Sequence, residues 1–117
     1  MVHLIRQRAS NDCGIACAAM LMGTSYDTMA AKLSDALTRR GIEAGLMAKT
    51  LGLEVFKFER RVTLQYVGDG IALVLKPRAR KHGHYVVVSG NDVFDPSREE
   101  KATRSAYAKC RVARLLR

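Results

Sequence analysis

Four residues of this chain have the types and the order that cysteine-based acyl transfer needs. Cys13 lies within Asp12-Cys13-Gly14, Gln7 precedes it by six positions, and His84 and Asp95 follow far downstream. A thiol can attack a carbonyl carbon, an imidazole can take its proton, a carboxylate can orient the imidazole, and an amide N–H can stabilise the oxyanion. The set predicts a nucleophile, a general base, an orienting carboxylate and an oxyanion donor.

Cys13 is expected in the first turn of a helix over residues 11–22, with Asn11 or Asp12 as N-cap and Gly23 after its end. At that position unpaired backbone N–H groups and the helix dipole favour a thiolate. The competing interpretation is a buried structural cysteine, because free cysteines are among the most buried residues. The other three members of the set favour the nucleophile.

His84 is the expected partner of the thiol. It opens the apolar, β-branched run 85–88, which predicts a strand with the imidazole at its mouth. His82 is the alternative, but it lies in the basic loop 78–83, which we expect to be solvated. His3 lies in the N-terminal segment and is a poorer candidate.

Asp95 is the expected orienting carboxylate. A short strand over 92–94 follows the turn 89–91, and an antiparallel hairpin of this kind would return Asp95 to a place beside His84. Its carboxylate could then accept from one ring nitrogen and fix the tautomer. Asp92 is the alternative, although it lies in the turn itself.

The elements that must position these residues predict an α+β domain. Helices come first and antiparallel strands follow. The expected helices are 11–22, 25–38 with Ser25 as N-cap, and 42–51, ended by Gly52; the expected strands are 53–58, 71–75, 84–88 and 92–94. We expect a helix over 99–109 and a strand over 111–116. A single domain, 1–117, would have a helical half (about 11–52) and a sheet half (about 53–117), with the site between them.

Charge and composition restrict the partners. The 117 residues carry 20 Lys and Arg against 11 Asp and Glu, a net charge of +9. A balance this basic favours an acidic partner, although it is also compatible with a solubilising surface. No aromatic residues interleave with the basic clusters as base stacking requires, which argues against nucleic acid without removing it as an alternative.

The remaining composition predicts a cytoplasmic protein without a metal. Three cysteines (Cys13, Cys17 and Cys110) do not describe a disulfide framework, and no histidine pair completes a zinc set. The longest apolar runs, such as 15–22, are shorter than the ~18–20 residues that span a bilayer. The N-terminus is charged too early for a secretory signal.

The two motifs together resemble the bacteriocin-processing, double-glycine-leader peptidases, a family of papain-like cysteine peptidases. The resemblance rests on the segment 7–20, on His84 to Val88 with Asp95-Pro96, and on the segment 41–53 between them. It implies the papain-like fold, with N-terminal helices packed on an antiparallel sheet. It also implies that neither a metal nor an organic cofactor takes part.

Carried onto this chain, the resemblance implies Cys13 as nucleophile, His84 as general base and acid, Asp95 as orienting residue, and Gln7 in the oxyanion hole. Domains of that family often begin peptide-exporting, ATP-driven transporters and cleave after paired small residues. This chain has neither a P-loop sequence nor a membrane-length apolar run. We therefore expect a freestanding cysteine peptidase that hydrolyses a peptide bond of a peptide or protein substrate through a thioester.

One alternative uses the same residues for a different acyl transfer. The thioester could serve isopeptide cleavage, deamidation or transamidation, because the first half-reaction is the same. A third possibility is a non-enzymatic basic module that binds an acidic protein or nucleic acid.

Overall fold

The computed structural model describes residues 2–75 and 83–117. Within them the helices α1 (Cys13–Met22), α2 (Tyr26–Leu33) and α3 (Ala44–Leu51) come first. The strands follow as β1 (Val55–Lys57), β2 (Gly70–Leu75), β3 (His84–Ser89), β4 (Asp92–Phe94), β5 (Ala102–Thr103) and β6 (Arg111–Leu116). Short 3-10 turns lie at Ser34–Ala36, Leu64–Tyr66 and Arg104–Tyr107. This order confirms the expected α+β class.

The helices begin and end close to the expected residues. Ser25 caps α2 by accepting from the Thr28 N–H, and Glu43, which was not expected as a cap, accepts from two N–H groups at the start of α3. Helix α2 is shorter than the expected 25–38. The backbone becomes extended at Leu37 and then forms a tight turn at 38–41. Asp12 occupies the expected N-cap position of α1, but its side chain makes no cap hydrogen bond.

The strands form one antiparallel sheet in the order β1-β6-β2-β3-β4-β5. The hairpin of β3 and β4 pairs Val87 with Phe94 and Val88 with Val93 across the expected turn. The last strand, β6, pairs with β1 on one side and with β2 on the other. A strand over 111–116 is thus confirmed, and it lies inside the sheet.

The helix expected over 99–109 is wrong. Ala102 and Thr103 instead add a short strand to β4, opposite Val93 and Asp92. The Arg104 guanidinium then donates to three backbone carbonyls, those of Gly90, Leu64 and Val67, at 2.5–2.7 Å. These tertiary contacts override the local helix propensity of the segment.

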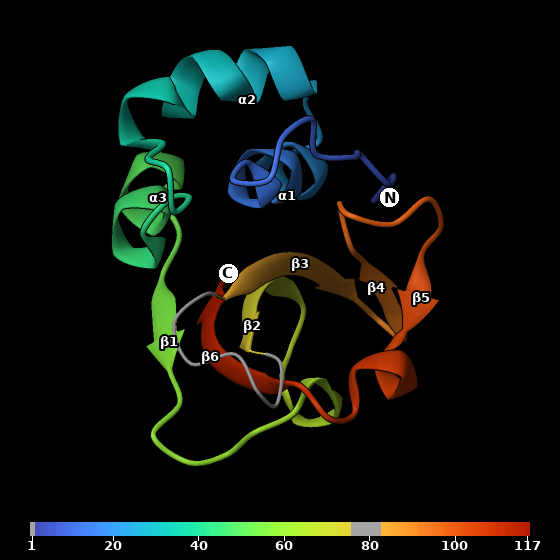
Figure 1. Cartoon of the computed structure of the whole chain (residues 1–117). Coiled ribbons are helices and arrows are strands. Elements are labelled where there is room, and N and C mark those ends of the chain that lie inside the picture. The colour runs from blue at the N-terminus through green and yellow to red at the C-terminus, as the bar shows by residue number, and fades with distance from the viewer. Residues whose placement is uncertain (1, 76–82) are drawn as a thin grey trace.

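The core lies on both faces of the sheet, which explains why β2 and β3 are apolar without alternation. One cluster joins Ile71, Tyr85 and Val87 to the three helices, and a second joins the intervening Ala72, Val86 and Val88 to Leu64, Tyr107 and Val112 on the opposite face. Figure 1 shows the helices gathered on one side of the curved sheet, with α1 between α2 and β3. No helix in the described residues is long and apolar enough to cross a membrane.

Helix α1 packs against β3. A Cβ at Gly14 would stand 3.4 Å from the Met47 sulfur and 3.4 Å from the ring of Tyr85, which are ordinary contact distances. Cys13 is the first residue of α1 and His84 the first residue of β3.

Candidate active site

Cys13 is the first residue of α1 and lies at the wall of a cleft. Its side chain is mostly buried, with 8% of the residue exposed. The cleft is lined from the helical half by Ser10, Asn11, Cys13, Arg39, Arg40, Gly41, Ile42, Glu43 and Ala44, and from the sheet half by Leu73, Gly83, His84, Tyr85, Ala113 and Arg114. A molecule bound there would contact the thiol from a space formed by both halves.

His84, the first residue of β3, lies between a carboxylate and the thiol. Its Nε2 is 2.6 Å from Asp95 Oδ1, and the Cys13 thiol lines the same cleft and acts on the pKa of the ring. Because Nε2 faces Asp95, Nδ1 is the nitrogen left for the thiol. Burial of the ring lowers the pKa of His84, but the hydrogen bonds and charges of Asp95 and Cys13 outweigh it and raise the pKa to about 9.

Asp95 follows β4 directly and is almost completely buried. The Ser97 N–H and hydroxyl donate to its Oδ1 at 2.9 and 2.6 Å, and the Tyr107 hydroxyl donates to Oδ2 at 2.5 Å. Burial raises the pKa of this carboxyl, but the bonds from His84, Ser97 and Tyr107 hold the pKa well below its usual range. Asp95 therefore stays charged beside the imidazole.

Ser97 and Tyr107 were not expected from the sequence. Ser97 stands two residues after the aspartate, where a hydroxyl often bonds back to the preceding Asx, and this spacing was a usable signal. Tyr107 lies in a segment expected to be helical, and it reaches Asp95 only because that segment folds under β3 as a 3-10 turn. No local sequence pattern predicts such a contact.

Gln7 lies near the site, but its amide is engaged elsewhere. Its backbone N–H donates to the Pro96 carbonyl at 2.9 Å, and its side chain lines a second pocket together with His84 and Asp95. The Nε2 group donates to the Ala9 carbonyl at 2.7 Å, while Oε1 is buried without a partner among the described residues. The side-chain NH2 thus donates one of its two N–H groups to Ala9, in a residue that lines the same pocket as His84.

Asp12, adjacent to the thiol, has a role that the sequence reasoning missed. It is buried, and its carboxylate accepts from the backbone N–H of Arg8 at 2.9 Å, from that of Ala9 at 3.0 Å, and from the Tyr26 hydroxyl. Burial raises the pKa of Asp12, but these hydrogen bonds outweigh it and lower the pKa. The carboxylate fixes the loop that carries Gln7 instead of capping the helix.

Among the described residues, the alternatives His3 and Asp92 line neither pocket that contains His84. Cys17 is fully buried one turn further along α1, and burial raises the pKa of its thiol. His3 lines a different pocket, beside Asp92, whose carboxylate pairs with Lys101 at 3.1 Å. His82 lies outside the described residues. Across 2–75 and 83–117, no group of three His, Cys, Asp or Glu side chains is arranged to hold a metal ion.

The N-terminal helices packed on a six-stranded antiparallel sheet match the papain-like peptidase fold. Two solved structures with this fold match nearly the whole chain. The peptidase domain of Streptococcus ComA, a bi-functional ABC transporter in a quorum-sensing pathway, has a TM-score of 0.64 and 20% identity, over 99% of this chain and 98% of that chain.

The second is a double glycine motif protease from an AMS/PCAT transporter, solved in complex with the leader peptide. It has a TM-score of 0.68 and 20% identity, over 99% of this chain and 89% of that chain. No protein-family model and no curated protein matches the sequence. The resemblance noted in the sequence is therefore confirmed at the level of the fold.

Proposed function

We propose that this protein is a cysteine peptidase in which Cys13, His84 and Asp95 act as a triad. The observation that carries the proposal is the placement of His84, whose imidazole bonds to the buried Asp95 carboxylate at 2.6 Å and lines the same cleft as the Cys13 thiol. Each partner has a chemical reason to be there. An imidazolium beside the sulfur favours the thiolate, and a charged carboxylate behind the ring favours the imidazolium.

The reaction has two half-steps. The Cys13 thiolate attacks the carbonyl carbon of the scissile bond, a C–S bond forms, and the carbonyl oxygen becomes an oxyanion. The oxyanion collapses, the C–N bond breaks, and His84 gives its proton to the departing amine. His84 then takes a proton from water as the water attacks the thioester, and the C–S bond breaks to release the acid. Asp95 orients the ring and stabilises its charged form.

Gln7 is the proposed second oxyanion donor, beside the backbone N–H of Cys13. Its Nε2 carries two N–H groups, of which one donates to the Ala9 carbonyl, and the other is the proposed donor to the oxyanion. A charged acceptor forms the stronger bond, so the donor would engage when negative charge develops.

A peptide is the proposed substrate class. The similar double glycine motif protease was solved with a leader peptide, and a peptide containing Gly-Gly is therefore the first substrate to test. Incubation followed by mass spectrometry separates the possible reactions. New termini that require Cys13 support the peptidase. A mass shift of about one unit without cleavage indicates deamidation through the same thioester and would overturn the peptidase assignment.

The reactivity of the thiol tests the triad without a substrate. We expect Cys13 to be alkylated by iodoacetamide at neutral and mildly acidic pH, and His84→Ala to lose this low-pH reactivity, because the imidazolium that favours the thiolate is gone. Peptide mapping restricts the measurement to Cys13 and gives Cys17, buried in the same helix, as an internal control. Equal alkylation of Cys13 in the wild type and in His84→Ala at mildly acidic pH would contradict the proposal.

A further inference from the structure

We propose that the cleft selects peptides with carboxylate side chains, and that the turn Thr38–Gly41 makes this selection by presenting Arg39 and Arg40. The inference rests on the proposed peptidase function and adds the chemical class of its substrate. It comes from the shape of the turn, its attachment to the site, and the balance of charge in the cleft.

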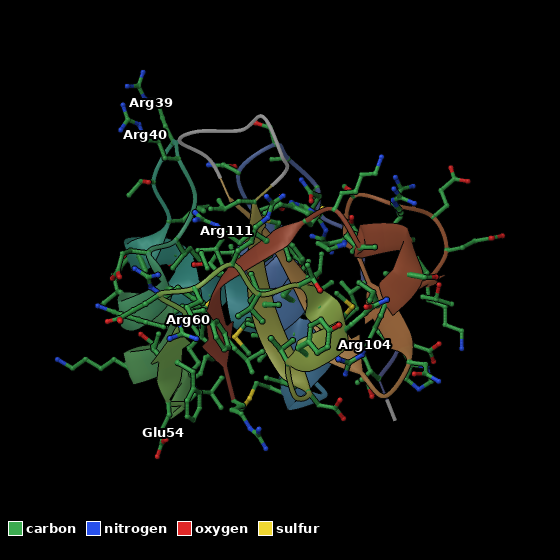
Figure 2. The ribbon with its side chains drawn as sticks, turned by 90° about the horizontal axis from the view of Figure 1, so that it is seen from below. Arg39, Arg40, Glu54, Arg60, Arg104 and Arg111 are labelled. Atoms are coloured by element: carbon green, nitrogen blue, oxygen red, sulfur yellow. The ribbon has the colours of Figure 1, made fainter. Side chains whose placement is uncertain are left out.

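The turn is built to hold two side chains outward. Thr38 and Gly41 exchange two backbone hydrogen bonds, at 2.9 and 3.0 Å, so Arg39 and Arg40 occupy the tip. The Thr38 hydroxyl accepts from the Arg40 N–H and donates to the Gly41 carbonyl. Gly41 has φ of 102°, a conformation that side chains other than glycine rarely adopt. Figure 2 shows both arginines projecting together from this tip.

Two contacts attach the turn to the candidate active site. The Asn11 amide, two residues before the thiol, donates to the Thr38 carbonyl at 2.8 Å. The Tyr85 hydroxyl, from the residue after His84, donates to the Ile42 carbonyl at 2.8 Å. The backbone that carries the two arginines is therefore held next to the residues that flank Cys13 and His84 in the sequence.

The charge of the cleft is unbalanced. Arg39, Arg40 and Arg114 line it, and Glu43 is its one carboxylate among the described lining residues. Both oxygens of Glu43 already accept backbone N–H groups of α3, at 2.9 Å each. None of the three arginines forms an ion pair with a carboxylate in the described part of the chain.

A peptide carboxylate is the ligand that this arrangement fits. Guanidinium groups bind carboxylates through two parallel N–H donors, and charge complementarity in a cleft speeds encounter and discriminates between partners. A solubilising role alone would not need the turn to be attached at Asn11 and Tyr85. Glutamate or aspartate residues that flank the cleaved bond would lie against the turn.

The chain supplies a matched control. Arg60 and Arg61 are also adjacent and exposed, and they do not line the cleft. Figure 2 shows Arg60 well apart from Arg39 and Arg40. Reversing either pair changes the net charge of the protein by the same amount, so the comparison separates a local effect from a general electrostatic one.

The experiment measures binding, so it does not depend on turnover. Fluorescence anisotropy compares a labelled glutamate-containing peptide with its glutamine counterpart, using the full chain with Cys13→Ala. We expect the glutamate peptide to bind more tightly, and the double variant Arg39→Glu/Arg40→Glu to weaken its binding by about tenfold while the glutamine peptide changes little. Arg60→Glu/Arg61→Glu should leave the preference intact. Added salt should reduce the preference.

Equal binding of the two peptides, or equal loss in both double variants, would overturn the inference. These outcomes are distinguishable from failure of the proposed function. If the protein cleaves peptides without a preference for glutamate, the proposed triad stands and only the proposed substrate class is wrong. If the protein binds the glutamate peptide through Arg39 and Arg40 but its Cys13 thiol has ordinary reactivity, the proposed acidic-peptide site stands and the proposed peptidase function is wrong.

Discussion

At Asp95, donors from three other residues converge on one buried carboxylate. His84 and Ser97 share one oxygen, and the Tyr107 hydroxyl approaches the other. A buried charge is tolerated only when its lone pairs are satisfied in this way. The sequence predicted the carboxylate and the histidine from the hairpin that joins them. It could not predict Tyr107, because that contact depends on a segment whose fold is set by tertiary packing.

The pair of His84 and Asp95 predicts a specific dependence of activity on pH. The pKa of His84 is raised to about 9, so the ring carries its proton through neutral pH and loses it as the pH rises through about 9. We expect kcat/KM for peptide cleavage to fall on that alkaline side. In Asp95→Asn the neutral amide no longer stabilises the imidazolium, and the fall should move toward ~6.5.

Stability should follow the same sign. A protonated His84 stabilises the fold fully below its ordinary pKa of 6.5, and this contribution is lost as the pH rises through about 9.

The predicted pH dependence of activity is checked by measuring kcat/KM against pH for the wild type and for Asp95→Asn. An alkaline limb that stays in place in the variant would show that His84 is not the titrating group.

At the scale of elements, the loop before α1 is held by the start of α2. Tyr26 donates its hydroxyl to Asp12, its ring lies 4.0 Å from the Arg8 guanidinium, and Arg8 pairs with Asp27 at 2.7 Å. Helix α2 therefore positions the loop that carries Gln7, although none of its residues lines either pocket beside His84.

Tyr26→Phe tests this support while keeping the ring under Arg8. Asp12 loses one donor, and the amides of Arg8 and Ala9, which bond to the same carboxylate, should exchange with solvent about tenfold faster, as expected for a lost hydrogen bond of ~1–1.5 kcal/mol. Hydrogen exchange read by NMR measures both amides. Tyr66→Phe, with a ring 80% exposed, is the control and should change neither. Unchanged exchange in Tyr26→Phe would contradict the role of α2.

The sequence predicted elements best where their signals are local. Capping residues mark helix ends at Ser25, Gly23 and Gly52. The changes from polar loop to apolar run located the ends of β2, β3 and β4 to within one residue. The helix prediction for residues 99–109 failed because a two-residue strand and a 3-10 turn leave no periodic signal in the sequence. The hydrogen bond from the Gln7 side-chain amide to the Ala9 carbonyl likewise could not be predicted from the spacing of residues in the sequence.

At the scale of the whole molecule, the sheet is a shared wall between two apolar clusters. Leu116, fully buried in β6, packs in the cluster that also contains Cys13 and α1. We expect Leu116→Ala to lower the free energy of unfolding by about 2–5 kcal/mol, because it leaves a cavity between the helices and the sheet.

Urea denaturation measures this loss. Leu46→Ala is the matched control, since Leu46 is 44% exposed on α3 and alanine suits a helix, so its free energy of unfolding should change by less than about 0.5 kcal/mol. A comparable loss in both variants would show that β6 is not a central part of the core.

The central place of β6 also sets when this polypeptide can fold during its own synthesis. The ribosome makes β1 and β2 early, yet they do not pair with each other, because the strand between them is residues 111–116. Until that segment emerges, both strands keep unpaired edges and the apolar face of α1 lacks part of its cover. Such nascent species aggregate or bind chaperones. The apolar cluster that joins α1 to the sheet would therefore be complete only after Leu116 has left the ribosome.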